Sequence, residues 1–168
     1  MYGNSTLSRY PIIDEKNIDL SIDSRKSRGC LYTQVTLPSH KQKTKSLSIF
    51  NLHLGISFKE RPRQLGRIVH SPEFSGLDNA APCIIAGDFN DLWKRLAPML
   101  TEILGFDCAT NHKHGYQNAI LTYPSFSPTN GLDKIFCRGI HIVKGKRSQL
   151  RSAKVASDHL PVIADLII

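Results

Sequence analysis

The sequence contains no apolar run approaching the ~20 residues that a membrane-spanning helix needs, so we expect no transmembrane segment. The first residues also lack a charged stretch followed by an apolar one, which predicts the absence of a signal peptide. Cys-X-X-Cys spacing is missing as well. Scattered cysteines of this kind are typical of reduced thiols, and they predict a cytoplasmic protein without disulfides. The four are Cys30, Cys83, Cys108 and Cys137.

Acidic side chains are few relative to basic ones. The sequence holds 22 Lys and Arg against 14 Asp and Glu, which gives a formal net charge of +8. A basic balance favours polyanionic partners, such as nucleic acids or anionic lipid headgroups. A solvated basic surface without a partner is the alternative interpretation. The charge therefore agrees with a phosphate-bearing substrate and does not choose among such substrates.

The chain has no internal repeat, and its 168 residues suffice for one domain with a sizeable core. Alternating or fully apolar segments predict strands, and apolar residues at helical spacing predict helices. The strands are expected over residues 30–37, 46–54, 82–86, 132–137, 140–144 and 160–168, and the helices over 59–69 and 91–104. Residues 14–29 are expected to form a loop or an exposed edge hairpin, and residues 107–128 a long loop. Strands interspersed with helices predict an α/β layered fold.

Polar residues follow the buried strand predicted at 82–86. Asp88 and Asn90 lie two apart just after this strand, behind Gly87. In an extended segment their side chains point the same way, toward one cleft. The alternative is that the carboxylate only caps the next helix. A cap accounts for one of the two residues and leaves the other unexplained.

Asp158 and His159 precede the last predicted strand, so they place a carboxylate beside an imidazole at a strand end. Asp133 opens another strand and is able to orient an imidazole by accepting its ring N–H. The alternative for each is a polar residue that merely ends a loop or starts a strand.

Asn51 and His53 form a polar pair at the end of the strand over 46–54. Two residues apart in a strand, they share a face and are able to contact phosphate oxygens at the rim of a sheet. A solvated strand end is the alternative. Arg61 and Gln64 share a face of the following helix, and we expect this pair to be exposed and structural.

Five motifs occur in a fixed order along the chain: GNSTLSRYPI (residues 3–12), NLHLG (51–55), GDFND (87–91), LDKIF (132–136) and SDHLPV (157–162). In this order the motifs resemble the endonuclease/exonuclease/phosphatase superfamily, whose fold is that of pancreatic deoxyribonuclease. Bacterial phosphodiesterase-type members are the most similar. The resemblance implies a four-layer α/β sandwich of two mixed sheets flanked by helices, and a metal-dependent phosphodiester hydrolase with a nucleic-acid or phospholipid-type substrate.

The resemblance also implies catalytic roles. His159 and Asp133 would form a dyad that activates water or stabilises the pentacovalent phosphorus. Asp88 would orient the nucleophile or protonate the leaving oxygen. Asn90 would hydrogen-bond the scissile phosphate, and His53 would contact it from the opposite side and serve as general acid.

The remaining implied roles concern the metal and the substrate. Asp158, with Asp88 and Asn90 nearby, would hold Mg²⁺, with Mn²⁺ as the alternative. Asn51 would support substrate binding together with Asn90 and His53. The substrate itself would be selected by the loops at residues 38–45 and 107–128.

The first two strands of the superfamily carry an asparagine and a glutamate metal ligand, and neither strand is matched in this sequence. We therefore expect residues 1–168 to form a single domain that is truncated at its N-terminus. The alternative function is a catalytically impaired fragment that acts at most as a binding module.

Overall fold

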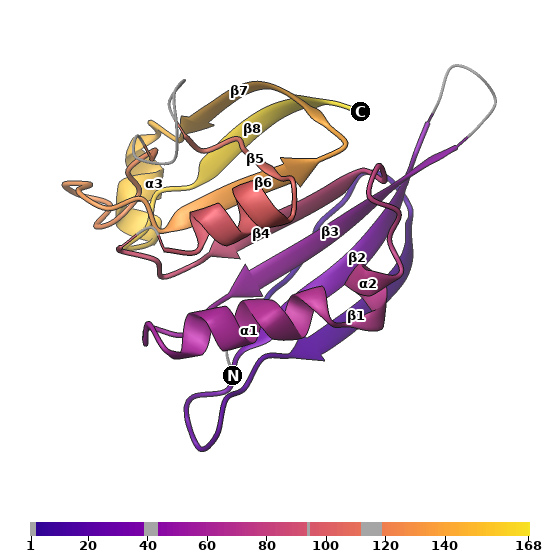
Figure 1. The fold of residues 1–168 in the computed structure, drawn as a ribbon. Helices are drawn as coiled ribbons and strands as arrows, with labels where there is room; N and C mark the ends of the chain where they lie inside the picture. Colours follow the sequence, from indigo (N-terminus) through magenta and orange to yellow (C-terminus); the bar gives the residue numbers. More distant parts are fainter. Residues whose placement is uncertain (1–2, 39–43, 94, 112–118) are drawn as a thin grey trace.

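A six-stranded mixed sheet forms the centre of the computed structural model, which describes residues 3–38, 44–93, 95–111 and 119–168. Across the sheet the strands follow the order β1 (Ile12–Asp19), β2 (Gly29–Leu37), β3 (Lys45–His53), β4 (Cys83–Asp88), β6 (Asp133–Arg138) and β5 (Asp107–Cys108). Only β3 and β4 run parallel, whereas the other neighbours are antiparallel. Figure 1 shows β3 and β4 ending at the left edge of the sheet, where β6 begins.

Helices cover one face of this sheet, and a second sheet covers part of the other. The helical face carries α1 (Glu60–Val69), α2 (Pro72–Ser75) and the short π-helix η1 (Met99–Ile103). The opposite face packs against the antiparallel pair β7 (His141–Arg147) and β8 (Val162–Ile167). Helix α3 (Arg151–Ala156) connects β7 to β8 near the left edge in Figure 1.

Alternation along β3 explains why the sheet has two different faces. Phe50 and Leu52 are fully buried in the core beneath the helices. Ile49, Asn51 and His53 project to the opposite side, because successive strand residues point to opposite faces. On this face of the sheet, Ile49 therefore packs against β7 and β8, and the polar residues Asn51 and His53 follow toward the end of the strand.

The structure confirms the α/β fold class predicted from the sequence, with two sheets and helices flanking them. It also confirms the edge-hairpin alternative for residues 14–29, since β1 pairs with β2 at the sheet edge. The four cysteines are free thiols. Within the described residues, the second sheet consists of β7 and β8 alone.

The long amphipathic helix predicted over residues 91–104 is wrong. Turns follow Asp91, and the regular helical part is only the π-helix η1. Leu92 and Ile103, which were expected in the apolar stripe, are exposed. Pro98 gives a physical reason, because proline has no N–H for a helical hydrogen bond and clashes with the preceding turn. Asp91 caps the segment instead, where its Oδ2 accepts a hydrogen bond from the backbone N–H of Leu96 at 2.7 Å.

Two further expectations need correction. Arg61 and Gln64 on α1 were expected to be exposed, but both are buried. Gln64 Oε1 accepts from the backbone N–H of Gly55, and Arg61 donates to the carbonyl of Ile56, so both side chains secure the loop after β3. The loop expected over residues 107–128 contains the short strand β5, and residues 112–118 within it lie outside the described part.

None of the helices in the described part of the chain has the length and apolar character needed to cross a membrane.

Candidate active site

Three ionisable residues line up across the carboxyl edge of the central sheet. The register pairs His53 of β3 with Asp88 of β4, and Asp88 with Asp133 of β6. Residues paired directly on neighbouring strands project to the same face, with Cβ atoms about 4.5–5.5 Å apart. One imidazole and two carboxylates, far apart in the sequence, therefore meet on one face.

His159 joins this row from the segment that precedes β8. Its ring Nδ1 lies 2.8 Å from Asp133 Oδ2. An ionised carboxylate only accepts, so Nδ1–H is the donor, and in the neutral form of the imidazole Nε2 keeps its lone pair. Thr122 donates its hydroxyl to the same carboxylate oxygen at 2.5 Å. The Tyr123 ring packs against the imidazole, with ring centroids 5.0 Å apart, so the orientation of His159 is fixed from two sides.

The surroundings of His159 favour its protonated form. Burial lowers the pKa of His159, but the hydrogen bond with Asp133 and the negative charges of Asp133, Asp88 and Asp158 outweigh burial. The pKa of His159 therefore lies above the ordinary value of 6.5. A raised pKa makes the imidazole a stronger base for a proton taken from water.

Asp88 and Asn90 stand in a sharp turn at the end of β4. Asn90 adopts a positive φ of 50°, a conformation that is uncommon outside glycine and that clusters at functional sites. The backbone N–H of Asn90 donates to Asp88 Oδ1 at 2.8 Å, and its side-chain Nδ2 donates to the Leu54 carbonyl at 2.9 Å. These bonds tie the turn to the loop after β3.

His53 and Asp88 shift each other's titration. Burial raises the pKa of Asp88, and the charge of Asp133 adds to this, while the Asn90 hydrogen bond and the two histidines oppose it. Burial lowers the pKa of His53, as do the charges of Arg28 and Lys26, against the pull of Asp88. His53 Nε2 lies 3.5 Å from Asp88 Oδ2. Both shifts favour the neutral forms of the two groups.

An open groove of about 540 Å³ runs along the sheet face beside this row. Its lining includes Asp133 and His159 of the row, together with Asn51, Gly87 and Ile135. The Asn51 side chain donates to the Ser5 carbonyl at 2.8 Å, so it holds the segment before β1 against the groove. Asn51 thus lies beside the catalytic candidates rather than among them.

The three predicted metal ligands do not form a cage. Asp88 is engaged by Asn90 and faces His53, while the Asp158 side chain is exposed on the loop before β8. Among the described residues no group of three or more His, Cys, Asp or Glu side chains is placed to hold a metal ion. The residues described here therefore do not by themselves fit the near-octahedral oxygen shell that Mg²⁺ requires, which waters and substrate phosphates commonly complete.

Two members of the site were not found from the sequence. Thr122 and Tyr123 lie in a polar segment without periodicity, and only the tertiary fold brings them to Asp133 and His159. A threonine hydroxyl that orients a carboxylate has no local sequence signal.

Comparisons with known proteins bear on the fold. No protein-family model matches the chain. The uncharacterized protein YbhP of Escherichia coli (strain K12) is 30% identical over 165 residues, which cover 98% of this chain and 62% of the relative, and YbhP of Shigella flexneri matches equally. The chain thus spans about three fifths of the length of these curated relatives.

Solved structures share the architecture. A mannosyl-6-phosphatase of Bacteroides thetaiotaomicron superposes with a TM-score of 0.72 at 20% identity, covering 95% of this chain and 67% of that chain. An endonuclease/exonuclease/phosphatase family protein of the same organism gives 0.69 at 20% identity, with 94% and 65% covered. The chain therefore shares the fold of these proteins. TDP2 of D. rerio, solved with a single-strand DNA product, has the same fold at a TM-score of 0.70 and 17% identity, with 95% and 69% covered.

Proposed function

We propose that this chain hydrolyses phosphate esters, and specifically phosphodiesters, at the row formed by His53, Asp88, Asp133 and His159. The observation that carries the proposal is the hydrogen bond from His159 Nδ1 to Asp133 Oδ2 beside two further ionisable groups in register. A dyad of this kind frees Nε2 to take a proton from water. The superfamily fold supports the same chemistry by analogy.

In the proposed reaction, water attacks phosphorus in line with the leaving oxygen. His159 Nε2 takes the proton as the P–O bond to water forms, and Asp133 stabilises the resulting imidazolium. Thr122 and Tyr123 act on His159 through its orientation. The electron pair of the breaking P–O bond stays on the leaving oxygen, which then needs a proton.

Asp88 and His53 stand where that proton is needed. The raised pKa of Asp88 allows its carboxyl to carry a proton at a pH where an exposed aspartate is ionised. His53, half exposed beside it, is the second candidate donor from the opposite side. One N–H of the Asn90 side chain is used by Leu54, and the other is available for a phosphate oxygen.

The test is hydrolysis of bis(p-nitrophenyl) phosphate by the chain, compared with His159→Asn and Asp88→Asn. Removing a general base or acid typically costs 10²–10⁴ in rate, so kcat/KM is expected to fall by about 100-fold or more in each variant. His141→Asn is the matched control, because His141 is an exposed histidine on β7 away from the row. If His159→Asn retains most of the activity of the unchanged chain, the proposal is wrong.

A requirement for Mg²⁺, with Mn²⁺ as the alternative, is also part of the proposal, and it rests on the resemblance of the motifs. None of the steps above passes through the ion, because the described residues make no metal cage. Nucleic acids and phospholipids both contain the required diester. The basic composition supports both, with a net charge of +8.

A further inference from the structure

Large apolar side chains are exposed to solvent on the loops next to the candidate active site. Five such residues, each between 49% and 78% exposed, lie on three loops near the site edge: Ile56, Phe58, Leu92, Trp93 and Phe126. Scattered exposed apolar residues are ordinary, but several gathered at one place mark an interaction surface. We call these five residues the apolar rim.

Two of the three loops are held together by buried polar contacts. The loop with Ile56 follows β3 and the loop with Leu92 follows β4, and these strands are parallel neighbours whose ends lie in register. Buried Arg61 donates to the Ile56 carbonyl at 2.6 Å and lies 3.7 Å from Asp91, the residue before Leu92. The Asn90 side chain adds a bond to Leu54. The two loops therefore lie side by side, and each carries exposed apolar side chains.

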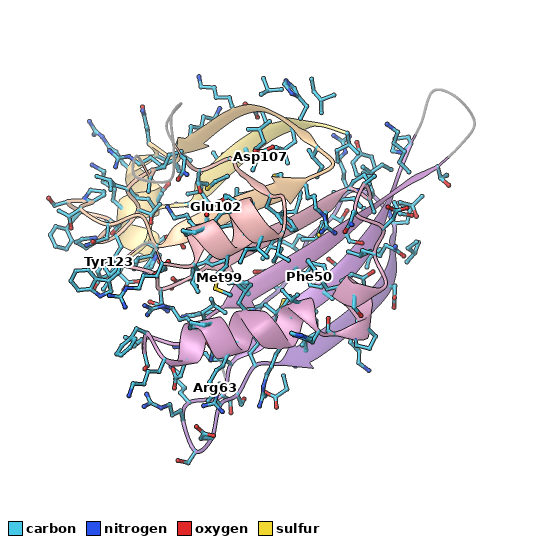
Figure 2. The ribbon with its side chains drawn as sticks, in the orientation of Figure 1. Phe50, Arg63, Met99, Glu102, Asp107 and Tyr123 are labelled. Carbon is cyan, nitrogen blue, oxygen red and sulfur yellow. The ribbon has the colours of Figure 1, made fainter. Side chains whose placement is uncertain are left out.

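The third loop flanks the site from the other side. Tyr123 packs against His159, and Phe126 lies three residues further along the same turn. Figure 2 shows Tyr123 at the left edge of the molecule, beyond the ends of the strands. Exposed apolar side chains therefore lie on the loops after β3 and after β4, and on the loop before β6 whose Tyr123 contacts His159.

Basic residues accompany the rim. Lys59 and Arg95 are exposed on the two loops that carry Ile56 and Leu92. Lys154 is exposed on α3, and its backbone carbonyl accepts a hydrogen bond from the hydroxyl of Ser125, the residue before Phe126. The positive charges of Arg28 and Lys26 reach the site strongly enough to lower the pKa of His53. The edge therefore combines apolar tips with a positive field.

We propose that this edge docks on an anionic phospholipid bilayer, and that the diester hydrolysed is that of a lipid headgroup. The substrate part rests on the proposed function, whereas the docking does not. Trp, Phe and Leu beside Lys and Arg are the composition of surfaces that lie in the headgroup region of a membrane. Single-stranded nucleic acids are instead bound on aromatic platforms, and Ile56 and Leu92 have no aromatic face on which a base stacks.

Trp93 provides a built-in reporter, because it is the single tryptophan of the chain. The experiment adds vesicles of mixed phosphatidylglycerol and phosphatidylcholine and follows Trp93 emission together with co-sedimentation. We expect a blue shift of the emission and co-sedimentation with the mixed vesicles, and weaker binding to vesicles of phosphatidylcholine alone because the basic residues then lack a counter-charge.

Ile56→Ser is the test variant, and Ile167→Ser is its matched control. Ile167 is an exposed isoleucine of β8 at the far end of the molecule from the rim. We expect Ile56→Ser to weaken vesicle binding by about tenfold or more, in proportion to the apolar area it no longer buries, and Ile167→Ser to bind like the unchanged chain. Equal binding by all three chains overturns the proposal.

Two further outcomes separate the docking from the catalysis. If the unchanged chain hydrolyses bis(p-nitrophenyl) phosphate but does not bind the vesicles, the docking is refuted and the proposed function stands. If it binds vesicles and hydrolyses no diester, the docking stands and the lipid-substrate part fails with the proposed function. Tight binding of an oligothymidylate, lost in Trp93→Ser, without vesicle binding overturns the lipid proposal in favour of a nucleic acid.

Discussion

Replacing Gly87 by alanine tests how the site edge is built. Gly87 lies in β4 directly before Asp88, with a positive φ of 135° that side-chain-bearing residues rarely adopt. A Cβ at this position would overlap the carbonyl oxygen of Leu52 on β3. The backbone of β3 thus occupies the space that a Cβ would need, one pair before the register joins His53 to Asp88.

The expected cost has two parts. Holding a residue other than glycine in a sparsely populated backbone region costs about 1–3 kcal/mol. Inserting a methyl group into a filled space costs about 1–3 kcal/mol more. Gly87→Ala is therefore expected to lower the free energy of unfolding by about 2–6 kcal/mol, a large share of the ~5–15 kcal/mol that stabilises a typical domain.

Two control glycines separate the parts. Gly66, in the middle of α1, has an ordinary φ and nothing within 4 Å of an added Cβ, so Gly66→Ala is expected to stabilise the helix by about 0.5–1 kcal/mol. Gly105 also has free space but a positive φ of 69°, so Gly105→Ala is expected to show the backbone cost alone, about 1–3 kcal/mol.

Urea denaturation of the three variants measures these differences, and the hydrolysis assay reports whether the site survives. We expect Gly87→Ala to lose both stability and activity, since any relief of the overlap moves Asp88 away from its partners. If Gly87→Ala is as stable as Gly105→Ala, the close approach of β3 and β4 is not a constraint, and the reasoning about the site edge is refuted.

Three other perturbations have definite expected outcomes. The pKa of His159 is raised in the folded state, so the stability from its charged pair with Asp133 is fully present below about pH 6.5 and is lost as the pH rises through the folded pKa. Asp133→Asn should therefore lower the midpoint of the His159 titration measured by NMR, and should move the acidic limb of the kcat/KM profile to lower pH. An unchanged midpoint contradicts the dyad. Arg61→Met leaves the buried Asp91 carboxylate without its ion-pair partner, so it should lower the free energy of unfolding measured in urea by about 3–5 kcal/mol. The loss in the double variant with Asp91→Asn should be smaller than the sum of the two single losses, and additive losses would show that the pair is not coupled. Removal of divalent metal with EDTA should abolish hydrolysis, and added Mg²⁺ should restore it; full activity in EDTA would remove the metal from the proposal and leave the dyad untouched.

Much of the fold was predictable because a strand leaves a local pattern of alternating polarity in the sequence. Alternation in residues 30–37 and 46–54 reflects a sheet with two different faces, and the observed β2 and β3 match those segments closely. The prediction of a helix over residues 91–104 was wrong because leucines four residues apart show only which residues are apolar, and not whether the backbone between them is helical. Leu92 is exposed and the π-helix η1 starts only after Pro98, because a proline lacks the N–H that a helix running through this position would need, and spacing does not record this.

The sequence by itself determined the two faces of the central sheet and marked the strand ends at which polar residues accumulate. Those are local properties, fixed by side-chain polarity and the two-residue period of a strand. It also placed Asp88 and His159 among the candidates, through a resemblance of ordered motifs. What it left open was which of the polar residues meet.

Only the tertiary structure decided the partnerships. The register of three strands aligns His53, Asp88 and Asp133, and a loop from before β6 supplies Thr122 and Tyr123 to orient the dyad. The same packing buries Arg61, which was predicted from the sequence to be exposed, and leaves Trp93 exposed to solvent. Distances between residues far apart in the chain depend on how sheets and loops pack, and no local pattern encodes them.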